Sequence, residues 1–202
     1  SEVKELLDAR GLVAADVGVG AVSHGPGSFT GLRVGIVFAK TFAYVTGSRI
    51  VAVNTLQAIA ESVTSETSPE INRLHVVSDA QREQLFMSDF SRTDTGFWES
   101  SGPINIVDCD QWLKSAADQA SSEFATVGPG LAKLVDDLPE SIGCLPEEMW
   151  TPRASNVAAI AERLAADNQF ADPFELEPFY LRKSSAEEKR DAKLADEAAN
   201  QN

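Results

Sequence analysis

The hydrophobic positions in the first third of the chain predict strands and helices in alternation. Residues 16–23 form a near-continuous run of small and β-branched residues, which is typical of a strand covered on both faces. The apolar stretch from residue 29 to residue 45 predicts a long helix that ends at Gly47, and residues 49–53 predict a second buried strand. Together with the helical spacing at residues 2–10, this order predicts an α/β fold with parallel strands.

The pattern changes at residues 64–72, a polar segment with a proline that is the predicted domain boundary. Beyond it, residues 74–90 predict two strands joined at a turn, and residues 97–100 a third, so this part is expected to be antiparallel. Three further elements are expected downstream: a strand at residues 124–128, a helix beginning within residues 129–138, and a helix at residues 155–168 with a serine or asparagine cap.

These patterns divide the chain into three predicted parts. Residues 1–66 form a first subdomain, residues 67–183 a second α/β subdomain, and residues 184–202 a charged tail. From residue 186 onward the chain carries eight charged residues, and Leu194 is its one large apolar group. Such a segment buries too little apolar surface to offset its ordering entropy, so the tail is expected to be mobile.

Composition narrows the classes of function. The net charge of −14 repels phosphate backbones, so contact with nucleic acid is expected only through a basic partner. No apolar run approaches the roughly 18 residues of a membrane span, and the charged, amphipathic start is unlike a signal peptide. Cys109 and Cys144 form no CxxC motif and are expected to be small buried residues, which favours a reducing compartment and a cytoplasmic protein.

A glycine-rich stretch, HGPGSFTGLRVG at residues 24–35, raises the question of phosphate binding. It is not a Walker A loop, because the spacing differs and no lysine occurs before Lys40. It is not a dinucleotide fingerprint either, because Gly25, Gly27 and Gly31 give GxGxxxG and the next strand ends in Asn54 rather than a carboxylate. Although a helix N-terminus would favour an anion, no cofactor is expected.

Small residues recur every four positions along the predicted helix 29–46, at Gly31, Gly35, Ala39 and Ala43. Most of the other side chains of this helix are apolar, so it must be buried nearly all round, either as a core helix or against a partner. If the stripe faces outward, Gly35→Leu is expected to abolish association without unfolding the protein. The candidate interface residues are Phe29, Gly31, Leu32, Arg33, Gly35, Ile36, Ala39, Lys40 and Ala43.

Candidate catalytic residues are sparse. His24 and His75 are far apart and form no HxxxH motif, so no metal site is expected. Ser28 stands at a strand-to-helix turn without the Gly-x-Ser-x-Gly pattern, which favours a helix N-cap over a nucleophile. The charged side chains at residues 79–83 are expected to be solvated turn residues. No catalytic residue is therefore assigned.

Several segments in order resemble the bacterial TsaB (YeaZ) family. They are GPGSFTGLRVG with the following helix, VAVNTLQAIA, VVSDAQREQLF, PRASNVAAIAERL and LEPFYLRKSS. The resemblance covers nearly the whole chain, from about Leu6 to Ser185. The first of these motifs is the most specific, and the residues that carry it are Gly25, Pro26, Gly27, Ser28 and Thr30.

The resemblance implies the two-subdomain ASKHA fold of actin, Hsp70 and acetate kinase, with the first subdomain truncated at its N-terminus. It also implies a non-catalytic subunit. TsaB-like proteins pair with the catalytic subunit TsaD and, with the ATPase TsaE, serve threonylcarbamoyl transfer to adenosine 37 of tRNA. Their pairing surface comes from helices of the first subdomain, where helix 29–46 falls, and a homodimer through the same surface is expected without TsaD.

Three departures from the family pattern stand out. The family's leading strand with an Asp-Thr-Ser signature has no counterpart in this sequence, Gln81 stands where arginine is usual, and Asn54 and Thr55 replace a Ser-Ser pair. Two alternatives stay open: an independent α/β nucleotide-binding enzyme, and a glycoprotease-like metallopeptidase.

Overall fold

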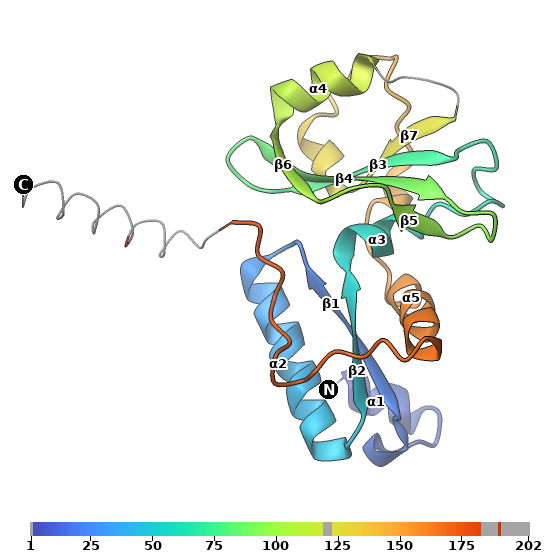
Figure 1. Ribbon diagram of the computed structural model, residues 1–202, viewed down its shortest axis with the longest axis vertical. Helices are drawn as coiled ribbons and strands as arrows, with labels where there is room; N and C mark the ends of the chain where they lie inside the picture. Colours follow the sequence, from blue (N-terminus) through green and yellow to red (C-terminus); the bar gives the residue numbers. More distant parts are fainter. Residues whose placement is uncertain (1, 119–122, 183–189, 191–202) are drawn as a thin grey trace, which may run out of the picture.

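The computed structural model describes residues 2–118, 123–182 and 190, and these form two lobes joined at a narrow junction (Figure 1). The lower lobe is built on two parallel strands, β1 (Val19–Gly25) and β2 (Arg49–Asn54), with Ala21 opposite Val51. The helix α2 (Phe29–Thr46) connects them, as the sequence predicts. The predicted first strand is displaced toward the C-terminus, because Ala14–Asp16 form a short 3-10 helix, η1.

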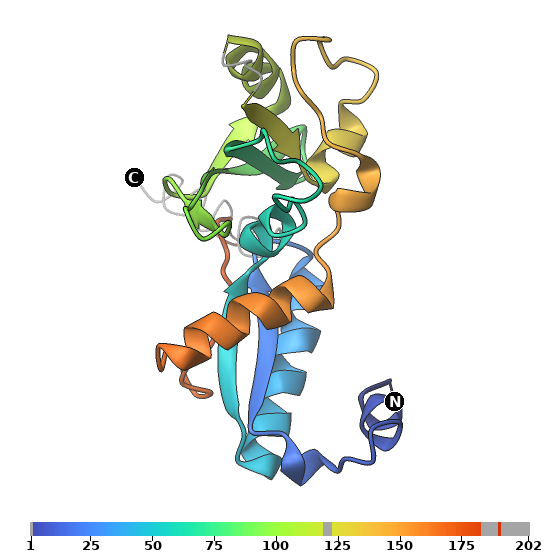
Figure 2. The same cartoon turned by 90° about the vertical axis from the view of Figure 1, so that its right-hand side faces the viewer.

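Two helices cover the two faces of this small sheet. The helix α2 lies along one face and α5 (Ala154–Ala166) crosses the other (Figure 2). Alternate residues of β2 supply both contacts, because successive side chains of a strand point to opposite faces. Ile50 packs with Ile36 and Ala43 of α2, whereas Val51 packs with Ile160 of α5.

The ends of α2 are specified locally. The Ser28 hydroxyl accepts a hydrogen bond from the Gly31 N–H at 3.3 Å, which confirms the predicted N-cap. Gly47 ends the helix with a φ of 75°, a left-handed conformation that glycine adopts without strain. The N-terminal helix α1 (Glu2–Asp8) has no buried residue and stands away from the body of the lobe (Figure 2).

The upper lobe contains a five-stranded sheet. Its strands run in the order β5-β4-β3-β7, and β6 also pairs with β4. The pairs β3–β4, β4–β5 and β4–β6 are antiparallel, whereas β3–β7 is parallel. The strands are β3 (Arg73–Asp79), β4 (Gln84–Arg92), β5 (Trp98–Ser100), β6 (Asn105–Asp108) and β7 (Phe124–Val127).

The upper lobe encloses the largest of the three core clusters among the described residues. The helix α4 (Cys109–Asp118) contributes Trp112, which packs with Leu74 and Leu85 of the sheet, and Trp98 is completely buried in the same cluster. Two 3-10 helices, η2 (Pro129–Lys133) and η3 (Glu147–Met149), complete the lobe.

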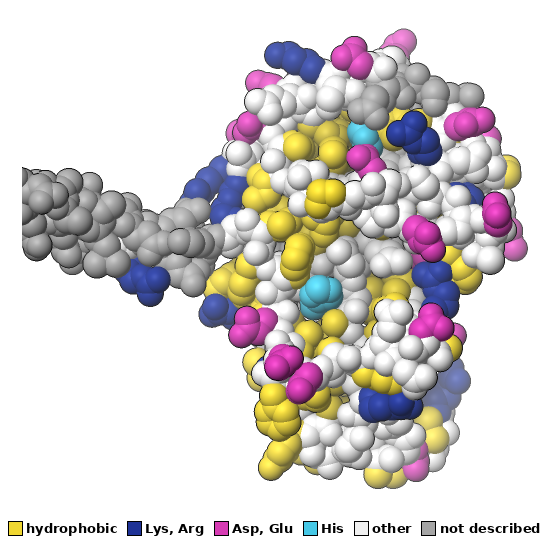
Figure 3. All heavy atoms as spheres, in the orientation of Figure 1, with side chains coloured by type: hydrophobic (Ala, Val, Ile, Leu, Met, Phe, Trp, Pro, Cys, Tyr) yellow, Lys and Arg dark blue, Asp and Glu magenta, His cyan; other side chains and the backbone are white. Residues whose placement is uncertain are grey.

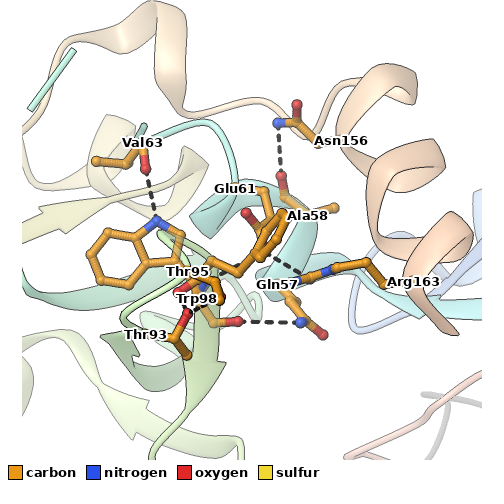
Figure 4. Close-up of polar contacts among 10 residues, drawn as sticks. Gln57, Ala58, Glu61, Val63, Thr93, Thr95, Trp98, Asn156 and Arg163 are labelled. Carbon is orange, nitrogen blue, oxygen red and sulfur yellow. Dashed lines mark hydrogen bonds and ion pairs between the residues drawn. The ribbon is translucent and has the colours of Figure 1, made fainter. Parts of the chain in front are cut away.

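The junction is crossed by a short helix, α3 (Thr55–Ala60), which Asn54 caps by accepting hydrogen bonds from the N–H groups of residues 56 and 57. Glu61, just after it, accepts a hydrogen bond from Arg163 Nη2 of α5 at 3.0 Å and another from the Trp98 N–H at 3.3 Å (Figure 4). Asn156 donates to the Ala58 carbonyl oxygen at 3.1 Å. Polar contacts therefore tie α5 and the upper lobe to the same helix.

Several predicted elements differ from the observed ones. β1 has exposed and half-buried positions rather than two covered faces, and the helix predicted to begin within residues 129–138 is a short 3-10 helix at residues 129–133. β6 and α4 were not expected from the sequence pattern. The N-cap of α5 is Arg153 without a side-chain hydrogen bond, so the predicted serine or asparagine cap is wrong.

The packing also departs from the predicted division of the chain. The sequence pattern places α5 and the segment that follows it in the second subdomain, but α5 packs against β2 and β1 of the lower lobe. A division at residues 66 and 67 thus separates elements that share a core. Apart from Arg190, the predicted mobile tail at residues 184–202 lies outside the described residues.

Candidate partner-binding surface

One face of α2 points away from the sheet and is apolar. Its exposed side chains are Val34 (65% exposed), Val37 (61%), Tyr44 (83%) and Val45 (76%), with Phe38 (51%) at its edge, where it also lines a cavity between α2 and β1, and we call these five the outer face of α2. Hydrophobic side chains gather along this edge of the lower lobe (Figure 3). Contiguous exposed apolar side chains of this size are typical of a protein–protein interface.

The small-residue stripe lies mostly on the opposite side of the helix. Ala43 is buried, Ala39 packs against the same core cluster, and a Cβ on Gly35 would lie 3.7 Å from Val22 of β1. Gly31 is exposed, at the first turn. After the first turn of α2, the small-residue stripe therefore faces the sheet. The expectation that Gly35→Leu abolishes association depended on the stripe facing outward, so its condition is not met.

The other candidate interface residues are divided between three surroundings. Leu32 and Ile36 are buried beneath α2. Phe29 is exposed at the first turn, where the Arg33 guanidinium carbon lies 3.9 Å from the centre of its ring. Lys40 is half-buried and donates a hydrogen bond to the Leu176 carbonyl oxygen at 3.0 Å.

Residues 176–182, which we call the strap, run alongside α2. The Tyr180 hydroxyl accepts a hydrogen bond from Arg33 Nε at 3.0 Å, and its ring stacks on Phe29 with 5.1 Å between ring centres. At the end of the strap, Arg182 donates hydrogen bonds to the Ala80 carbonyl oxygen and to Gln84 in the upper lobe. The two charged residues of α2 therefore hold the strap in place.

The glycine-rich loop is shaped by this strap. The His24 carbonyl oxygen accepts a hydrogen bond from the Phe179 N–H at 2.7 Å. Gly25 has a φ of 127°, and a Cβ there would lie 2.9 Å from the Phe179 carbonyl oxygen. Gly25 and Pro26 are buried, whereas Gly27 and Thr30 are exposed. Gly25 thus permits a close approach of two backbone segments, a role that the sequence pattern alone did not reveal.

A cavity of about 580 Å³ lies between the lobes at the start of α2, and we call it the junction notch. Three segments distant in sequence line it: the first turn of α2, the β3–β4 turn and the strap. The lining residues are Gly27, Ser28, Phe29, Thr30, Asp79, Ala80, Gln81, Arg82, Phe86, Phe179, Tyr180, Leu181 and Arg182.

The two histidines lie in different surroundings. Burial lowers the pKa of His24, whose ring lies edge-on to Phe179. His75 is buried in β3, and its Nε2 lies 2.8 Å from Asp89 Oδ1. Within residues 2–118, 123–182 and 190, no group of three or more His, Cys, Asp or Glu residues could hold a metal ion.

Asp79, one of the predicted turn residues, pairs with Lys133 at 2.7 Å.

Sequence reasoning missed the outer face of α2, although the sequence carries a signal for it. Val34, Val37, Phe38 and Val45 recur at the helical spacing i, i+3, i+4 and i+11, which places them on one side of a helix. The small-residue stripe was the more conspicuous pattern. Nothing in the sequence pattern indicates which of the two stripes faces the sheet.

The described part of the chain contains no helix with both the length and the apolar character needed to cross a membrane.

The fold defines a class of protein: a two-lobed α/β protein with an exposed helix beside the junction between its lobes. The family model for TsaD, tRNA N6-adenosine threonylcarbamoyltransferase, matches residues 1–133.

Relatives and solved structures agree with this match. The chain is 27% identical to the tRNA threonylcarbamoyladenosine biosynthesis protein TsaB of Escherichia coli (strain K12), over 91% of this chain and 79% of that protein. It is 28% identical to TsaB of Bacillus subtilis (strain 168), over 93% and 79%. YeaZ from Pseudomonas aeruginosa shares the fold with a TM-score of 0.73, at 21% identity over 89% of this chain and 81% of that one.

The chain belongs to the family that the TsaD model describes, and within it to the TsaB (YeaZ) proteins, with their two-lobed ASKHA-like α/β fold. This confirms the family and the fold class that the sequence motifs indicate.

Proposed function

We propose that this chain is a non-catalytic subunit that binds a TsaD-like catalytic subunit in the synthesis of threonylcarbamoyladenosine at position 37 of tRNA. Its relatives named TsaB are tRNA threonylcarbamoyladenosine biosynthesis proteins. A TsaE-like ATPase joins through the complex, and tRNA is contacted only indirectly, in keeping with the net charge of −14.

The outer face of α2 carries this proposal. Val37 and Phe38 present apolar surface at the middle of the helix, and Tyr44 and Val45 extend it toward the C-terminal end. A tyrosine at such a surface suits an interface, since its ring is apolar and its hydroxyl can hydrogen-bond. Without the catalytic subunit, the same face is expected to pair with a second copy of the chain around a two-fold axis.

Sedimentation of this chain mixed with the purified catalytic subunit tests the proposal. Val37→Glu places a charge in the centre of the outer face and is expected to abolish the complex, because an unpaired charge is costly to bury. Val135→Glu is the matched control, since Val135 is 56% exposed in the upper lobe, and it is expected to leave the complex intact. If both variants still form the complex, the assignment of this face as the interface is contradicted.

The alternative, an independent nucleotide-binding enzyme, makes a different prediction. It requires saturable binding of ATP, whereas the proposed subunit is expected to give no saturable heat when titrated with magnesium and ATP. The absence of a Walker lysine in the loop at residues 24–35 supports the second outcome. A stoichiometric micromolar isotherm would favour the enzyme.

A further inference from the structure

The β3–β4 turn, residues 80–83, has an unusual backbone conformation. Three consecutive residues, Gln81, Arg82 and Glu83, have φ values of 64°, 52° and 55°, in the left-handed region. Residues other than glycine rarely adopt this region, and such a conformation persists only where the surrounding structure holds it. The shape of this turn therefore depends on the contacts made to it.

The upper lobe supplies some of these contacts. At the start of the turn, Asp79 Oδ1 accepts a hydrogen bond from the Gln81 N–H at 2.6 Å. At its end, the Glu83 carbonyl oxygen accepts one from the Cys109 N–H at 3.0 Å. Both contacts come from within the same lobe, so they do not connect the turn to α2.

The strap adds a contact that joins the two sides of the turn. Arg182 Nη1 donates a hydrogen bond to the Ala80 carbonyl oxygen at 2.9 Å, and Nη2 donates to the side-chain oxygen of Gln84. These two residues flank the left-handed segment, and the Ala80 N–H donates to the Gln84 carbonyl oxygen at 2.9 Å. A guanidinium presents its donors in one rigid plane, which suits a grip on two acceptors at once. Arg182 therefore reinforces the closure of the turn.

The other end of the strap is fixed to the lower lobe. The strap runs beside α2 toward the junction (Figure 1), and the Tyr180 hydroxyl accepts a hydrogen bond from Arg33 Nε at 3.0 Å. The Phe179 N–H donates to the His24 carbonyl oxygen at 2.7 Å. Two residues of extended chain span at most about 7 Å, so Tyr180 and Arg182 cannot move independently over large distances. A shift of the strap on α2 is therefore transmitted to Arg182.

We propose that the strap couples the first turn of α2 to the β3–β4 turn. While Tyr180 is seated on α2, Arg182 holds the turn in its left-handed conformation, and when Tyr180 is released the turn opens more often. The coupling runs through a continuous chain of contacts from Arg33 through Tyr180 and Arg182 to Ala80. Both turns line the junction notch, so the strap also sets the shape of that cavity. This inference goes beyond the proposed function, because the coupling requires no partner.

Amide hydrogen exchange of the full chain, resolved by residue with NMR, tests the proposal. The reporters are the N–H groups of Ala80 and Gln84, which donate hydrogen bonds within the turn. Tyr180→Ala removes the contacts of the side chain with α2 and is expected to speed exchange at both reporters roughly tenfold. Arg182→Gln removes the grip itself and is expected to have at least the same effect. Phe174→Ala is the matched control, since this aromatic side chain is 84% exposed just before the strap, and exchange at the reporters is expected to be unchanged.

Three other results would overturn the coupling. If only Arg182→Gln speeds exchange at the reporters, Arg182 holds the turn without help from Tyr180. If neither variant changes it, the strap does not hold the turn. If Phe174→Ala changes it as much as Tyr180→Ala does, the effect is not specific to the contact with α2.

Global unfolding is distinguished by the amides of Leu74 and Val76, in the part of β3 that lies in the upper core. Local opening leaves their exchange unchanged, whereas global unfolding speeds it as well. Should Tyr180→Ala unfold the whole chain, Tyr180→Phe decides instead, because it keeps the ring on α2 and loses the hydrogen bond to Arg33. A smaller rise, of about threefold, is then expected at the reporters in the turn, and no rise overturns the proposal.

Discussion

The two lobes use apolar residues in opposite ways. In the upper lobe they converge on one core, where Leu74, Leu85, Trp98 and Trp112 are almost completely removed from solvent. In the lower lobe the buried apolar side chains form two small clusters, one on each face of the β1–β2 sheet, with far fewer members. Yet the lower lobe also contains α2, one of the most apolar helices of the chain, with a whole face exposed.

This difference separates stability from recognition. A monomeric protein gains nothing from valine and phenylalanine side chains held in water, and this is why we propose that the outer face of α2 is covered in a complex. The upper lobe buries its large apolar side chains in one core. Changes in the upper lobe should therefore affect folding, whereas changes on the outer face of α2 should affect association.

The largest expected effect is at Gly128, which ends β7 in the upper lobe. Its φ is 127°, and a Cβ there would lie 2.1 Å from the Val77 carbonyl oxygen, so Gly128→Ala must displace backbone. We expect the free energy of unfolding to fall by at least about 3 kcal/mol, measured by urea denaturation. Gly102→Ala is the control, since a Cβ there meets no atom within 4 Å. Equal free energies of unfolding for the two variants would show that a Cβ at residue 128 fits without displacing the backbone at Val77.

A direct comparison of the lobes pairs Leu74 with Val37. Leu74→Ala removes a fully buried side chain from the upper core, and we expect a loss of about 2–5 kcal/mol. Val37→Ala shortens an exposed side chain of α2, and its effect on the stability of the monomer should stay within about 0.5 kcal/mol. Thermal unfolding of both variants at low protein concentration checks this. A large loss in Val37→Ala would mean that the outer face is covered within the monomer.

Gly35 tests the inner side of α2. An alanine Cβ there would lie 3.7 Å from Val22, an ordinary contact, so Gly35→Ala adds helix propensity without a clash. We expect a gain of about 0.5–1 kcal/mol in the free energy of unfolding.

For Gly35→Leu the structure changes the earlier expectation. The residue borders a cavity of about 360 Å³ between α2 and β1, so the added side chain points toward the sheet and association should persist. Sedimentation of Gly35→Leu beside Val37→Glu distinguishes the two sides of the helix. Failure of the Gly35→Leu variant to associate while folded would restore the stripe as the interface.

The smallest expected effect concerns Glu61 at the junction. Burial raises the pKa of its carboxyl group above the ordinary value of 4.5, and the Trp98 N–H and Arg163 partly oppose that shift. A carboxyl with a raised folded-state pKa binds its proton more tightly when folded. The free energy of unfolding therefore falls as the pH rises from 4.5 through the folded-state pKa.

Glu61→Gln cannot ionise, so this contribution to the pH dependence should disappear. Its amide oxygen can still accept the hydrogen bonds from Arg163 and the Trp98 N–H, which keeps the junction contacts of Figure 4 comparable. Urea denaturation of the unsubstituted protein and of Glu61→Gln, from pH 4.5 through the folded-state pKa, measures how the free energy of unfolding changes with pH. Parallel pH profiles for the two proteins would rule out Glu61 as a contributor.

The sequence by itself determined the local elements. The boundaries of α2 follow from Ser28 and Gly47, because caps act through hydrogen bonds and backbone conformations within a few residues. The apolar run of β2, the antiparallel β3–β4 pair and the motifs of the TsaB family were also evident from the sequence. The 3-10 helix at residues 129–133 was not, since its conformation depends on packing against β3.

The tertiary structure decided which faces are covered and which distant segments meet. α2 carries two apolar stripes, and only its packing on β1 and β2 shows that the small residues face inward and that Val37 faces outward. The return of α5 to the first lobe, and the strap that brings Tyr180 onto Arg33, join residues more than a hundred positions apart. Periodicity records which side chains share a face of a helix, but the neighbour that each face meets is set by contacts between elements far apart in the chain.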